Sequence, residues 1–413
     1  MIRKDKMKIL MCSDDPNTIL SYGLLSDMLI NRLYRDYDIH YLSLQRQVGK
    51  AIPMYNKRGE CRYTYYSSHN QGPRNPTSLP KVMMKVKPDI FWTNFDIQHY
   101  IQINNMVPPN ATWIGWCPWD NHDPNQIPRA QEAFKKVDTR IAISKFGMDF
   151  LNQHGVRMDD YIYNCINTDK FEPLPPDHKD ILKFKQMNPW YNDDLQLLLF
   201  VGRPNWRKRM RYLFSITQQL IARGNSNVRL FMHTSLDDPA AEADLRKVID
   251  AFGISNHVIT TNFDWDEGVP EEDLRILYNI SDIYVAPHAG EGFGMPIVEA
   301  MACGLPFIAS DICTTREFAG LNNERGLPSE VTWPKLPNGQ PIYDKGVHRS
   351  NPVVIPFVEK IEQLLADEKR RKRMGQNGVK WVRENCSIPV IADKWRKVFN
   401  KFDIPIEKVQ GYK

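Results

Sequence analysis

The chain has 413 residues, which is more than a single hydrophobic core usually holds, so the length predicts two domains. Hydrophobic residues make up 42% and charged residues 25%, as is ordinary for a globular protein in water. The formal net charge is only +5, and no stretch interleaves basic with aromatic residues, which argues against nucleic acid as a partner.

Cysteine usage and hydropathy predict a cytoplasmic protein. The seven cysteines are scattered, without Cys-x-x-Cys or a zinc-like cluster, which is typical of reduced thiols. The longest fully apolar run, Leu197–Val201, is far too short to span a bilayer. No apolar secretory segment follows the first residues, so we expect no transmembrane or signal segment.

The densest basic run is Lys369–Arg373. A solvated helix face is the first interpretation of such a run. The alternative is a weak attraction to acidic acceptors or anionic lipid headgroups, which would give a peripheral membrane contact.

Short apolar runs alternate with helical patterns in the first 166 residues, which predicts a parallel sheet flanked by helices. The helical pattern is clearest over Leu24–Leu33. The predicted strands are Lys8–Cys12, Ile39–Leu44, Ile90–Trp92, Thr112–Trp116 and Thr139–Ile143.

A segment rich in Pro and Asp, Asn167–Asp194, interrupts this rhythm and is interpreted as an interdomain connection. The alternation then restarts, and 326–352 is interpreted as a long surface loop. The expected strands are Leu195–Val201, Val228–Met232, Val258–Ile259, Ile283–Ala286 and Phe307–Ala309, and the expected helices are Met210–Arg223, Ala240–Phe252, Glu271–Ile280, Pro296–Ala302 and Pro389–Asn400.

These elements predict an α/β protein with two Rossmann-like, doubly wound domains. We expect an N-terminal domain over 1–175, a C-terminal domain over 190–388, and a final helical segment over 389–413.

A glycine-containing loop lies between the predicted strand Ile283–Ala286 and the helix that begins at Pro296. Ligands bind beyond the carboxyl ends of strands in open parallel sheets. Glycines allow a close backbone approach, and a helix N-terminus offers unpaired N–H groups that suit a phosphate. The loop therefore predicts an anion-binding site.

Two carboxylates flank this loop, Glu291 and Glu299. Carboxylates accept hydrogen bonds from the adjacent hydroxyls of a sugar or a ribose, but they repel a diphosphate. Arg203 and Lys208, at the end of another predicted strand, supply the cations that such a ligand needs. Taken singly, Glu299 could be a helix-terminal charge and the two cations could face solvent.

The loop is neither a Gly-x-Gly-x-x-Gly dinucleotide fingerprint nor a Walker loop. The segment at the end of the first strand, Cys12-Ser-Asp-Asp-Pro-Asn, contains no glycines. Its composition argues against a dinucleotide-dependent dehydrogenase.

Three segments resemble retaining glycosyltransferase family 4, an enzyme family with the GT-B fold. They are Glu291-Gly-Phe-Gly-Met-Pro-Ile-Val-Glu299, which matches the Glu-x7-Glu motif, Val201-Gly-Arg…Lys208, and Ile166-Asn-Thr-Asp-Lys-Phe171. The resemblance implies two domains facing across a cleft, with 1–175 on the acceptor side, 190–388 binding the nucleotide-sugar donor, and the segment 389–413 crossing back to the first domain. It also implies transfer of a sugar from a nucleotide diphosphate to a glycan or glycoconjugate hydroxyl, with retention of configuration.

The resemblance also implies the role of each donor-site residue. Arg203 and Lys208 would hold the diphosphate, Glu291 the sugar hydroxyls and Glu299 the ribose. Val258–Phe263 would line the base. The remaining expected donor-binding residues are Tyr22 and Gly23 of the first domain and Gly292, Phe293, Gly294, Met295, Pro296 and Ile297 of the loop.

The acceptor side is less defined, because the histidine usual in the family is not obvious here. Asp120 is the candidate catalytic residue, His122 competes with it, and a plain polar turn is the alternative for both. Asn94 and Asp96 could also face the cleft, Arg207 or Arg209 could share the role of Lys208, and His288 could sit near the donor.

We expect no obligatory cofactor or metal, because no Asp-x-Asp motif follows a predicted strand. The donor itself is a substrate, and GDP-mannose is favoured because mannosyl transfer is common among similar proteins. The alternatives are a non-catalytic nucleotide-sugar-binding or scaffold protein and another GT-B enzyme, such as a sugar-nucleotide epimerase or a phosphorylase.

Overall fold

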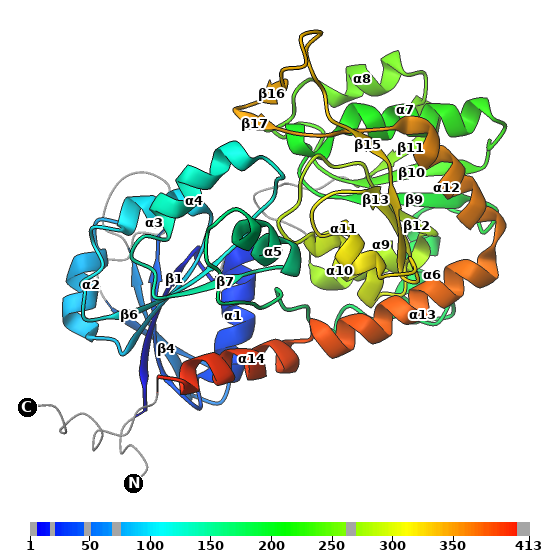
Figure 1. The fold of residues 1–413 in the computed structure, drawn as a ribbon. Coiled ribbons are helices and arrows are strands. Elements are labelled where there is room, and N and C mark those ends of the chain that lie inside the picture. Colours follow the sequence, from blue (N-terminus) through cyan, green and yellow to red (C-terminus); the bar gives the residue numbers. More distant parts are fainter. Residues whose placement is uncertain (1–5, 17–20, 45–50, 68–75, 262–269, 403–413) are drawn as a thin grey trace, which may run out of the picture. The chain divides into compact units, whose positions relative to one another are not determined.

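A computed structural model describes residues 6–16, 21–44, 51–67, 76–261 and 270–402 (Figure 1). The chain forms two compact α/β units. Unit 1 comprises the described parts of Met1–Trp119, Pro124–Cys165 and Cys386–Lys413, and unit 2 comprises Asp120–Asp123 and the described parts of Ile166–Asn385.

The sheet of unit 1 has the strand order β3-β4-β2-β1-β5-β6-β7-β8. The edge strand β3 runs antiparallel to β4, whereas the other neighbours are parallel. The strands are β1 (Lys8–Ser13), β2 (Asp38–Ser43), β3 (Ile52–Tyr55), β4 (Cys61–Ser67), β5 (Ile90–Asn94), β6 (Thr112–Cys117), β7 (Thr139–Ala142) and β8 (Asp160–Tyr161).

Helices flank this sheet, and side chains of β5 alternate between its two faces. Phe91 contributes to the cluster on one face, whereas Trp92 contacts Trp395 of the last helix, with ring centroids 4.5 Å apart. The helices of unit 1 are α1 (Ser21–Leu33), α2 (Leu79–Val86), α3 (Ile97–Ile103), α4 (Ile127–Ala133), α5 (Lys145–Gln153) and α14 (Ile388–Asn400).

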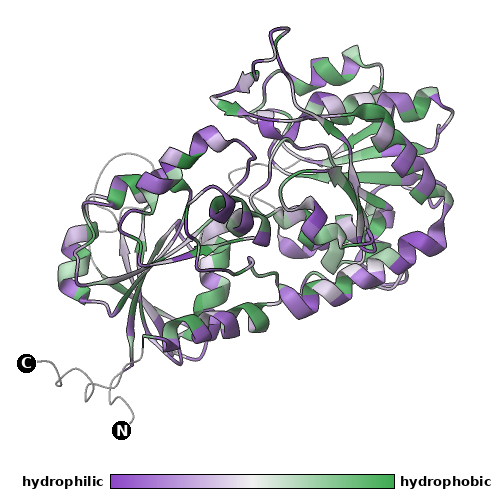
Figure 2. Ribbon diagram, viewed as in Figure 1, coloured by the Kyte–Doolittle hydropathy of each residue, from purple (hydrophilic) through white to green (hydrophobic). Residues whose placement is uncertain are grey.

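The sheet of unit 2 is fully parallel in its described strands, with the order β11-β10-β9-β12-β13-β14. Figure 2 shows hydrophobic strands in this sheet, in keeping with burial on both faces. The strands are β9 (Gln196–Val201), β10 (Val228–His233), β11 (Val258–Thr260), β12 (Ile283–Ala286), β13 (Phe307–Ser310) and β14 (Gly326–Ser329).

Helices cover both faces of the second sheet, and α13 is mostly hydrophilic along its length (Figure 2). No described helix is both long and apolar enough to cross a membrane. The helices of unit 2 are α6 (Lys179–Met187), α7 (Met210–Ala222), α8 (Leu245–Ala251), α9 (Glu271–Ile280), α10 (Met295–Ala302), α11 (Thr315–Ala319), α12 (Val354–Ala366) and α13 (Glu368–Asn385).

The predicted α/β class is confirmed, and some element boundaries were wrong. The helix predicted over Ala240–Phe252 is shorter, because the carboxylate of Asp244 caps it by accepting from the N–H groups of Arg246 and Lys247. The predicted loop 326–352 is partly strand. It contains β14, which pairs with β13, and the short strands β15 (Val331–Thr332), β16 (Tyr343–Asp344), β17 (Val347–His348) and β18 (Asn351–Pro352).

Candidate functional site

The strand order of unit 2 places two loops side by side. The chain reverses direction across the sheet between neighbours β9 and β12, which makes this position a topological switch point. In open α/β sheets, ligands bind in the crevice at the carboxyl ends of the strands at such a point. The residues that follow β9 and β12 therefore form the candidate site.

A main-chain hydrogen bond joins the two loops, since the N–H of Ala289 donates to the oxygen of Arg207 at 2.8 Å. After β9 the chain forms a short 3₁₀ helix over Trp206–Lys208. The side chain of Lys208 folds back over Gly202, at the end of β9, where a Cβ would lie 3.6 Å from Cε of the lysine.

Lys208 and Arg207 both pair with Glu291. Nζ of Lys208 lies 2.6 Å from Oε2 of Glu291, and Nη1 of Arg207 lies 3.3 Å from the same oxygen. Burial alone would favour a protonated Glu291, but the two cations outweigh burial and hold the pKa of Glu291 well below its usual range. Glu291 is therefore a carboxylate in the ligand-free site. Burial lowers the pKa of Lys208, and Glu291 opposes that shift.

Two glycines of the β12 loop permit this geometry. Gly290 has no room for a side chain, because a Cβ would lie 2.0 Å from Nη1 of Arg349 and 2.3 Å from the oxygen of Asp120. Gly294 has φ +94° and forms the N-cap of α10, where a left-handed conformation favours glycine. The loop thus delivers Glu291 next to the N-terminus of α10.

Asp120 belongs to the same cluster. Its main-chain oxygen accepts from Nη1 of Arg349 at 2.6 Å, and its carboxylate oxygens lie 3.1 and 3.2 Å from Nη2 of Arg349. Nε of Arg207 is 3.7 Å from Oδ2 of Asp120. Burial would raise the pKa of Asp120, but Arg349 and then Arg207 hold that pKa below its usual value.

His122 has a different environment from Asp120. Its Nε2 accepts a hydrogen bond from the N–H of Cys313 at 3.0 Å, and burial lowers the pKa of the imidazole. An imidazole nitrogen can accept only when it carries no proton, so the geometry fits a neutral His122 that holds the loop before α11. His122 and Asp120 therefore differ in what they can do, and both remain candidates on the acceptor side.

Arg203 does not join the Lys208–Glu291 cluster. Its guanidinium makes a two-point contact with Asp238, with Nε to Oδ2 at 2.8 Å and Nη2 to Oδ1 at 2.7 Å. The carboxylate of Asp238 is fully buried, whereas the side chain of Arg203 is 41% exposed. One edge of the guanidinium is thereby oriented by the protein while the side chain stays accessible to a ligand.

Glu299 lies in α10 and accepts a hydrogen bond from the hydroxyl of Tyr278 at 2.7 Å. Burial raises the pKa of Glu299 to about 7. Nearby, Phe293 packs edge-on against Phe318 at 5.2 Å, and the oxygen of Phe293 accepts from Oγ1 of Thr314. The two carboxylates of the Glu291–Glu299 segment thus have opposite pKa shifts.

Other predicted residues are distributed as follows. Gly292 is buried in the β12 loop, Met295, Pro296 and Ile297 form the first turn of α10, and His288 is buried with a pKa lowered to about 3 by desolvation. Val258 begins β11, but Phe263 lies outside the described residues. Tyr22 and Gly23 lie in α1 of unit 1, where the hydroxyl of Tyr22 donates to Asp96.

Asn94 ends β5 in unit 1, at the switch point between β1 and β5. It is fully buried, and neither polar atom of its side-chain amide has a hydrogen-bond partner among the residues that the structure describes.

Arg349 and Asp238 were missed by sequence reasoning. Asp238 lies shortly after β10, next to β9 in the sheet, and its position past a strand end is a signal that could have found it. Arg349 gave no local signal, because it follows the short strand β17 within a segment interpreted as a surface loop. Among the described residues, no group of three or more His, Cys, Asp or Glu side chains is placed to hold a metal ion.

Comparisons with known proteins match the part of the chain that contains these two loops. Residues 183–335 match the model of the family Glycosyl transferases group 1, and this match covers the Arg203–Lys208 and Glu291–Glu299 segments. An uncharacterized glycosyltransferase of Methanocaldococcus jannaschii is 26% identical over 250 residues, 60% of this chain and 54% of that protein. O-antigen chain mannosyltransferase B of Escherichia coli is 46% identical over 52 residues, 13% of this chain and 14% of that protein.

The chain thus spans about half or less of the length of these curated relatives. Among solved structures, Anabaena HepE in complex with UDP and glucose has a TM-score of 0.69 at 16% identity, covering 95% of this chain and 99% of that one. The two Rossmann-like units are those of the GT-B fold. The solved structure thus shows the fold, and the family match shows that residues 183–335 are similar to Glycosyl transferases group 1.

Proposed function

We propose that the chain is a retaining glycosyltransferase of family 4, which moves a sugar from a nucleotide diphosphate to an acceptor hydroxyl. The observation that carries this proposal is the Lys208–Glu291 pair, with 2.6 Å between Nζ and Oε2, at the switch point of a parallel sheet and beside the N-terminus of α10. Cations, a helix N-terminus and a carboxylate suit a diphosphate joined to a sugar.

Donor binding would separate Lys208 from Glu291, and each would contact a different part of the donor. The diphosphate offers Lys208 a new anionic partner, and Glu291, still balanced by Arg207 at 3.3 Å, can accept from the sugar hydroxyls. Arg203, oriented by Asp238, adds a planar fork for phosphate oxygens. In the ligand-free site, the pairing keeps Lys208, Arg207 and Glu291 next to groups of opposite charge.

The same groups would lower the barrier to sugar transfer. Negative charge develops on the diphosphate as the glycosidic bond breaks and the sugar becomes oxocarbenium-like. Lys208, Arg203 and the first turn of α10 are fixed beforehand around the place where that charge forms, which is electrostatic preorganisation. Asp120 is the proposed acceptor-side residue, since Arg349 keeps its carboxylate ionised and oriented.

The proposed donor is GDP-mannose, and the proposed acceptor is a glycan or glycoconjugate. The mannosyl preference is supported by the relative that is named a mannosyltransferase. A competing expectation is a uridine nucleotide, because HepE was solved with UDP and glucose. A cytoplasmic location and a peripheral membrane contact remain predictions.

A panel of nucleotide sugars tests the proposal. Thermal unfolding is followed with every donor at the same concentration, and a donor whose Kd lies 100-fold below that concentration adds about 2.7 kcal/mol by binding to the native state alone. We expect one base and one sugar to stand out, and Lys208→Met to abolish that shift. Equal shifts for every nucleotide would exclude a specific donor site.

Transfer itself is tested by release of nucleoside diphosphate, with and without an acceptor glycan, and by the anomeric configuration of the product. A specific thermal shift without acceptor-dependent release would instead indicate a non-catalytic nucleotide-sugar-binding protein. Inversion at the anomeric carbon would contradict the retaining mechanism alone.

A further inference from the structure

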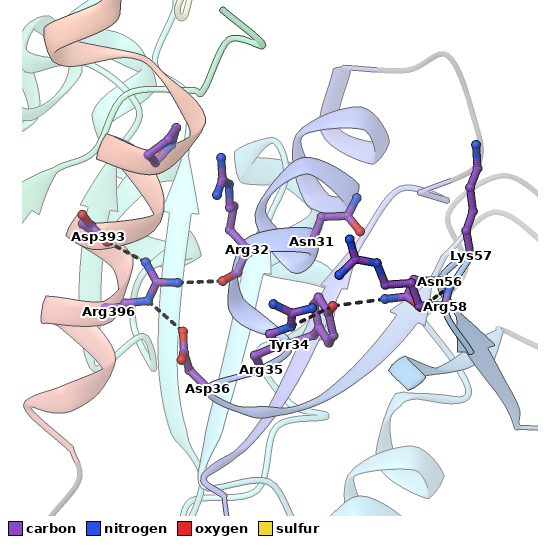
Figure 3. Close-up of a pocket in the computed structure, with 11 residues that line it drawn as sticks. Asn31, Arg32, Tyr34, Arg35, Asp36, Asn56, Lys57, Arg58, Asp393 and Arg396 are labelled. Carbon is purple, nitrogen blue, oxygen red and sulfur yellow. Dashed lines mark hydrogen bonds and ion pairs between the residues drawn. The ribbon is translucent and has the colours of Figure 1, made fainter. Parts of the chain in front are cut away.

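A pocket of about 750 Å³ lies in unit 1 at the edge of the sheet where β2 and β4 begin (Figure 3). In parallel sheets, ligands bind at the carboxyl ends of the strands, whereas this pocket lies at the amino ends. It is therefore separate from the end of the sheet that contains Asn94. It is lined by Asn31, Arg32, Tyr34, Arg35, Asp36, Asn56, Lys57, Arg58, Pro389, Asp393 and Arg396.

One wall of the pocket is fixed by Arg396 of α14. Its Nε lies 2.8 Å from Oδ2 of Asp36, its Nη1 lies 2.5 Å from Oδ1 of Asp393, and its Nη2 donates to the oxygen of Arg32 at 2.6 Å. Figure 3 shows Arg396 bridging toward Asp36 and the end of α1. The guanidinium of Arg396 is thus already used to join α14 to α1.

The opposite wall is the turn between β3 and β4, and Asn56 fixes it. Oδ1 of Asn56 accepts from the N–H groups of Arg58 and Glu60, at 2.9 and 3.0 Å, and the N–H of Asn56 donates to the oxygen of Glu60 at 2.9 Å. Arg35 pairs with Glu60 at 3.1 Å. The backbone that carries Lys57 and Arg58 is therefore held in one conformation.

Three cations of the pocket remain uncompensated. The guanidinium groups of Arg32 and Arg58 and the ammonium group of Lys57 make no ion pair or hydrogen bond with the described residues, whereas Arg35 and Arg396 do. Five cationic side chains line the pocket against two carboxylates, an excess of three charges. Figure 3 shows Arg32 on α1 and Lys57 and Arg58 on the β3–β4 turn.

We propose that this pocket binds a phosphate-bearing ligand through Arg32, Lys57 and Arg58. Arginine offers a planar fork for phosphate oxygens, and lysine adds a mobile point charge. Fixed walls lower the cost of ordering the site when the anion binds. Tyr34 is the one aromatic side chain among the lining residues, so the pocket lacks the series of aromatic rings on which successive bases stack, and a phosphate is favoured over single-stranded nucleic acid.

The ligand has two potential sources, a small soluble phosphate compound or the headgroup of an anionic lipid. Binding is measured on the full chain with two probes, inorganic pyrophosphate by calorimetry and vesicles containing phosphatidylglycerol by co-sedimentation. The test variant is Arg32→Gln/Lys57→Gln/Arg58→Gln. The matched control is Lys183→Gln/Lys380→Gln/Arg383→Gln, which removes the same charge from exposed positions of unit 2.

Pyrophosphate can also bind the proposed donor site, so all chains are titrated again in a Lys208→Met background. If the pocket binds pyrophosphate, binding should survive in Lys208→Met. We expect the pocket triple variant to weaken that binding at least about tenfold, while the unit 2 control changes it by less than about twofold. Higher salt should weaken it further, since exposed cations are screened. Circular dichroism establishes that each variant is folded.

Retention of wild-type affinity for both probes by the folded pocket triple variant would overturn the proposal, as would equal losses in the two triple variants. Pyrophosphate binding alone supports a soluble ligand, whereas vesicle binding alone supports a headgroup. Binding of neither probe by the unmodified protein would also overturn it. If the donor site does not bind pyrophosphate, Lys208→Met will not change pyrophosphate binding, whereas the pocket triple variant will still weaken it. The two proposals therefore fail in different ways.

Discussion

The guanidinium of Arg349 donates hydrogen bonds to two parts of Asp120. Its Nη1 lies 2.6 Å from the main-chain oxygen, and its Nη2 lies 3.1 and 3.2 Å from the two carboxylate oxygens. The same guanidinium lies over the ring of Trp206, with Cζ 5.1 Å from the centroid. Trp206 precedes Arg207 and Lys208 in the 3₁₀ helix. Arg349 therefore contacts both Asp120, the proposed acceptor-side residue, and the 3₁₀ helix that carries Lys208, which we propose binds the diphosphate.

We expect the Arg349–Asp120 contact to stabilise unit 2. Arg349→Met should cost about 1–3 kcal/mol, because a half-buried carboxylate loses its main partner. A double-mutant cycle with Asp120→Asn, followed by urea unfolding, should give a coupling energy of about 1–2 kcal/mol. Arg316→Met is the control, since Arg316 is 77% exposed and its pair with Asp311 should contribute less than about 0.5 kcal/mol. Additive effects of the first pair would contradict the expectation.

This pair should also make stability sensitive to acid. The pKa of Asp120 is lower in the folded chain than its ordinary value, so its contribution is present above that ordinary value and is lost as the pH falls through the lower folded one. In Arg349→Met the folded pKa of Asp120 rises, and this part of the acid dependence should shrink. Urea titrations at a series of pH values below 5 measure the difference. If the free energy of unfolding falls at low pH in Arg349→Met as it does in the unmodified protein, the Arg349–Asp120 pair does not cause the acid dependence.

Lys208→Met should lower kcat by roughly 10²–10³, because a preorganised charge opposite the departing diphosphate is lost. Arg211→Met is the matched control. Arg211 is an exposed cation in the first turn of α7, three residues along the chain, and its substitution should leave kcat within about twofold. Steady-state kinetics with the preferred donor provide the comparison. A kcat for Lys208→Met equal to that of the control would remove Lys208 from the catalytic site.

Asp238→Asn should weaken donor binding about tenfold, or roughly 1.4 kcal/mol, because Arg203 loses the carboxylate that orients its guanidinium. The neighbouring Asp237 gives the control, because its side chain is 75% exposed and it pairs with the exposed Arg246. Asp237→Asn should change the donor KM by less than about twofold. Similar KM values for the two variants would show that Arg203 needs no such support.

Glu299 should give opposite pH effects on binding and stability. Its pKa of about 7 means that it becomes a full hydrogen-bond acceptor only as the pH rises through 7, so donor KM should fall over that range. Its folded pKa is raised, so the stability linked to the protonated form is lost over the same rise in pH. Glu299→Gln should therefore stabilise the ligand-free protein at pH 8 by on the order of 1–3 kcal/mol, while raising donor KM and removing its pH dependence. If Glu299→Gln is less stable than the unmodified protein at pH 8, burial of the ionised carboxylate does not destabilise the fold.

Activity should persist in excess EDTA, within about twofold of the untreated value, if Lys208 and Arg203 supply the positive charge that the diphosphate needs. The assay is repeated with added magnesium and manganese. Complete loss in EDTA with recovery on adding a divalent ion would show that the donor enters the site as a metal complex.

The sequence indicated the strands of the second sheet because each is a short apolar run followed by glycine, proline or polar residues, as at Leu195–Val201 and Ile283–Ala286. It also indicated Glu291 and Lys208, since both follow predicted strands. It did not indicate that they are paired. Ion pairing between residues 83 positions apart depends on which strands are neighbours, and strand order is a property of the folded sheet.

Other features were missed for identifiable physical reasons. Strand β14 contains Pro328, which argues against a strand in a sequence, but β14 is at the sheet edge, where a missing N–H donor is tolerated. Arg349 lies among polar residues without periodicity, and only its tertiary contacts reveal its role. Arg203 and Lys208 were both expected to hold the diphosphate, but their different partners, Asp238 and Glu291, could not be predicted because they depend on which strands are neighbours.

The docking of α14 in unit 1 has a consequence for the order of synthesis and folding. Trp395 and Phe399 complete the aromatic core around Trp92 and Trp116, yet they lie beyond Ile166–Asn385, a stretch of 220 residues that the ribosome must translate first. At roughly 5–20 residues per second this delay is about 10–40 s. The unit that is begun first is thus completed last, and its unfinished tryptophan face is the surface that a chaperone would have to shield in the meantime.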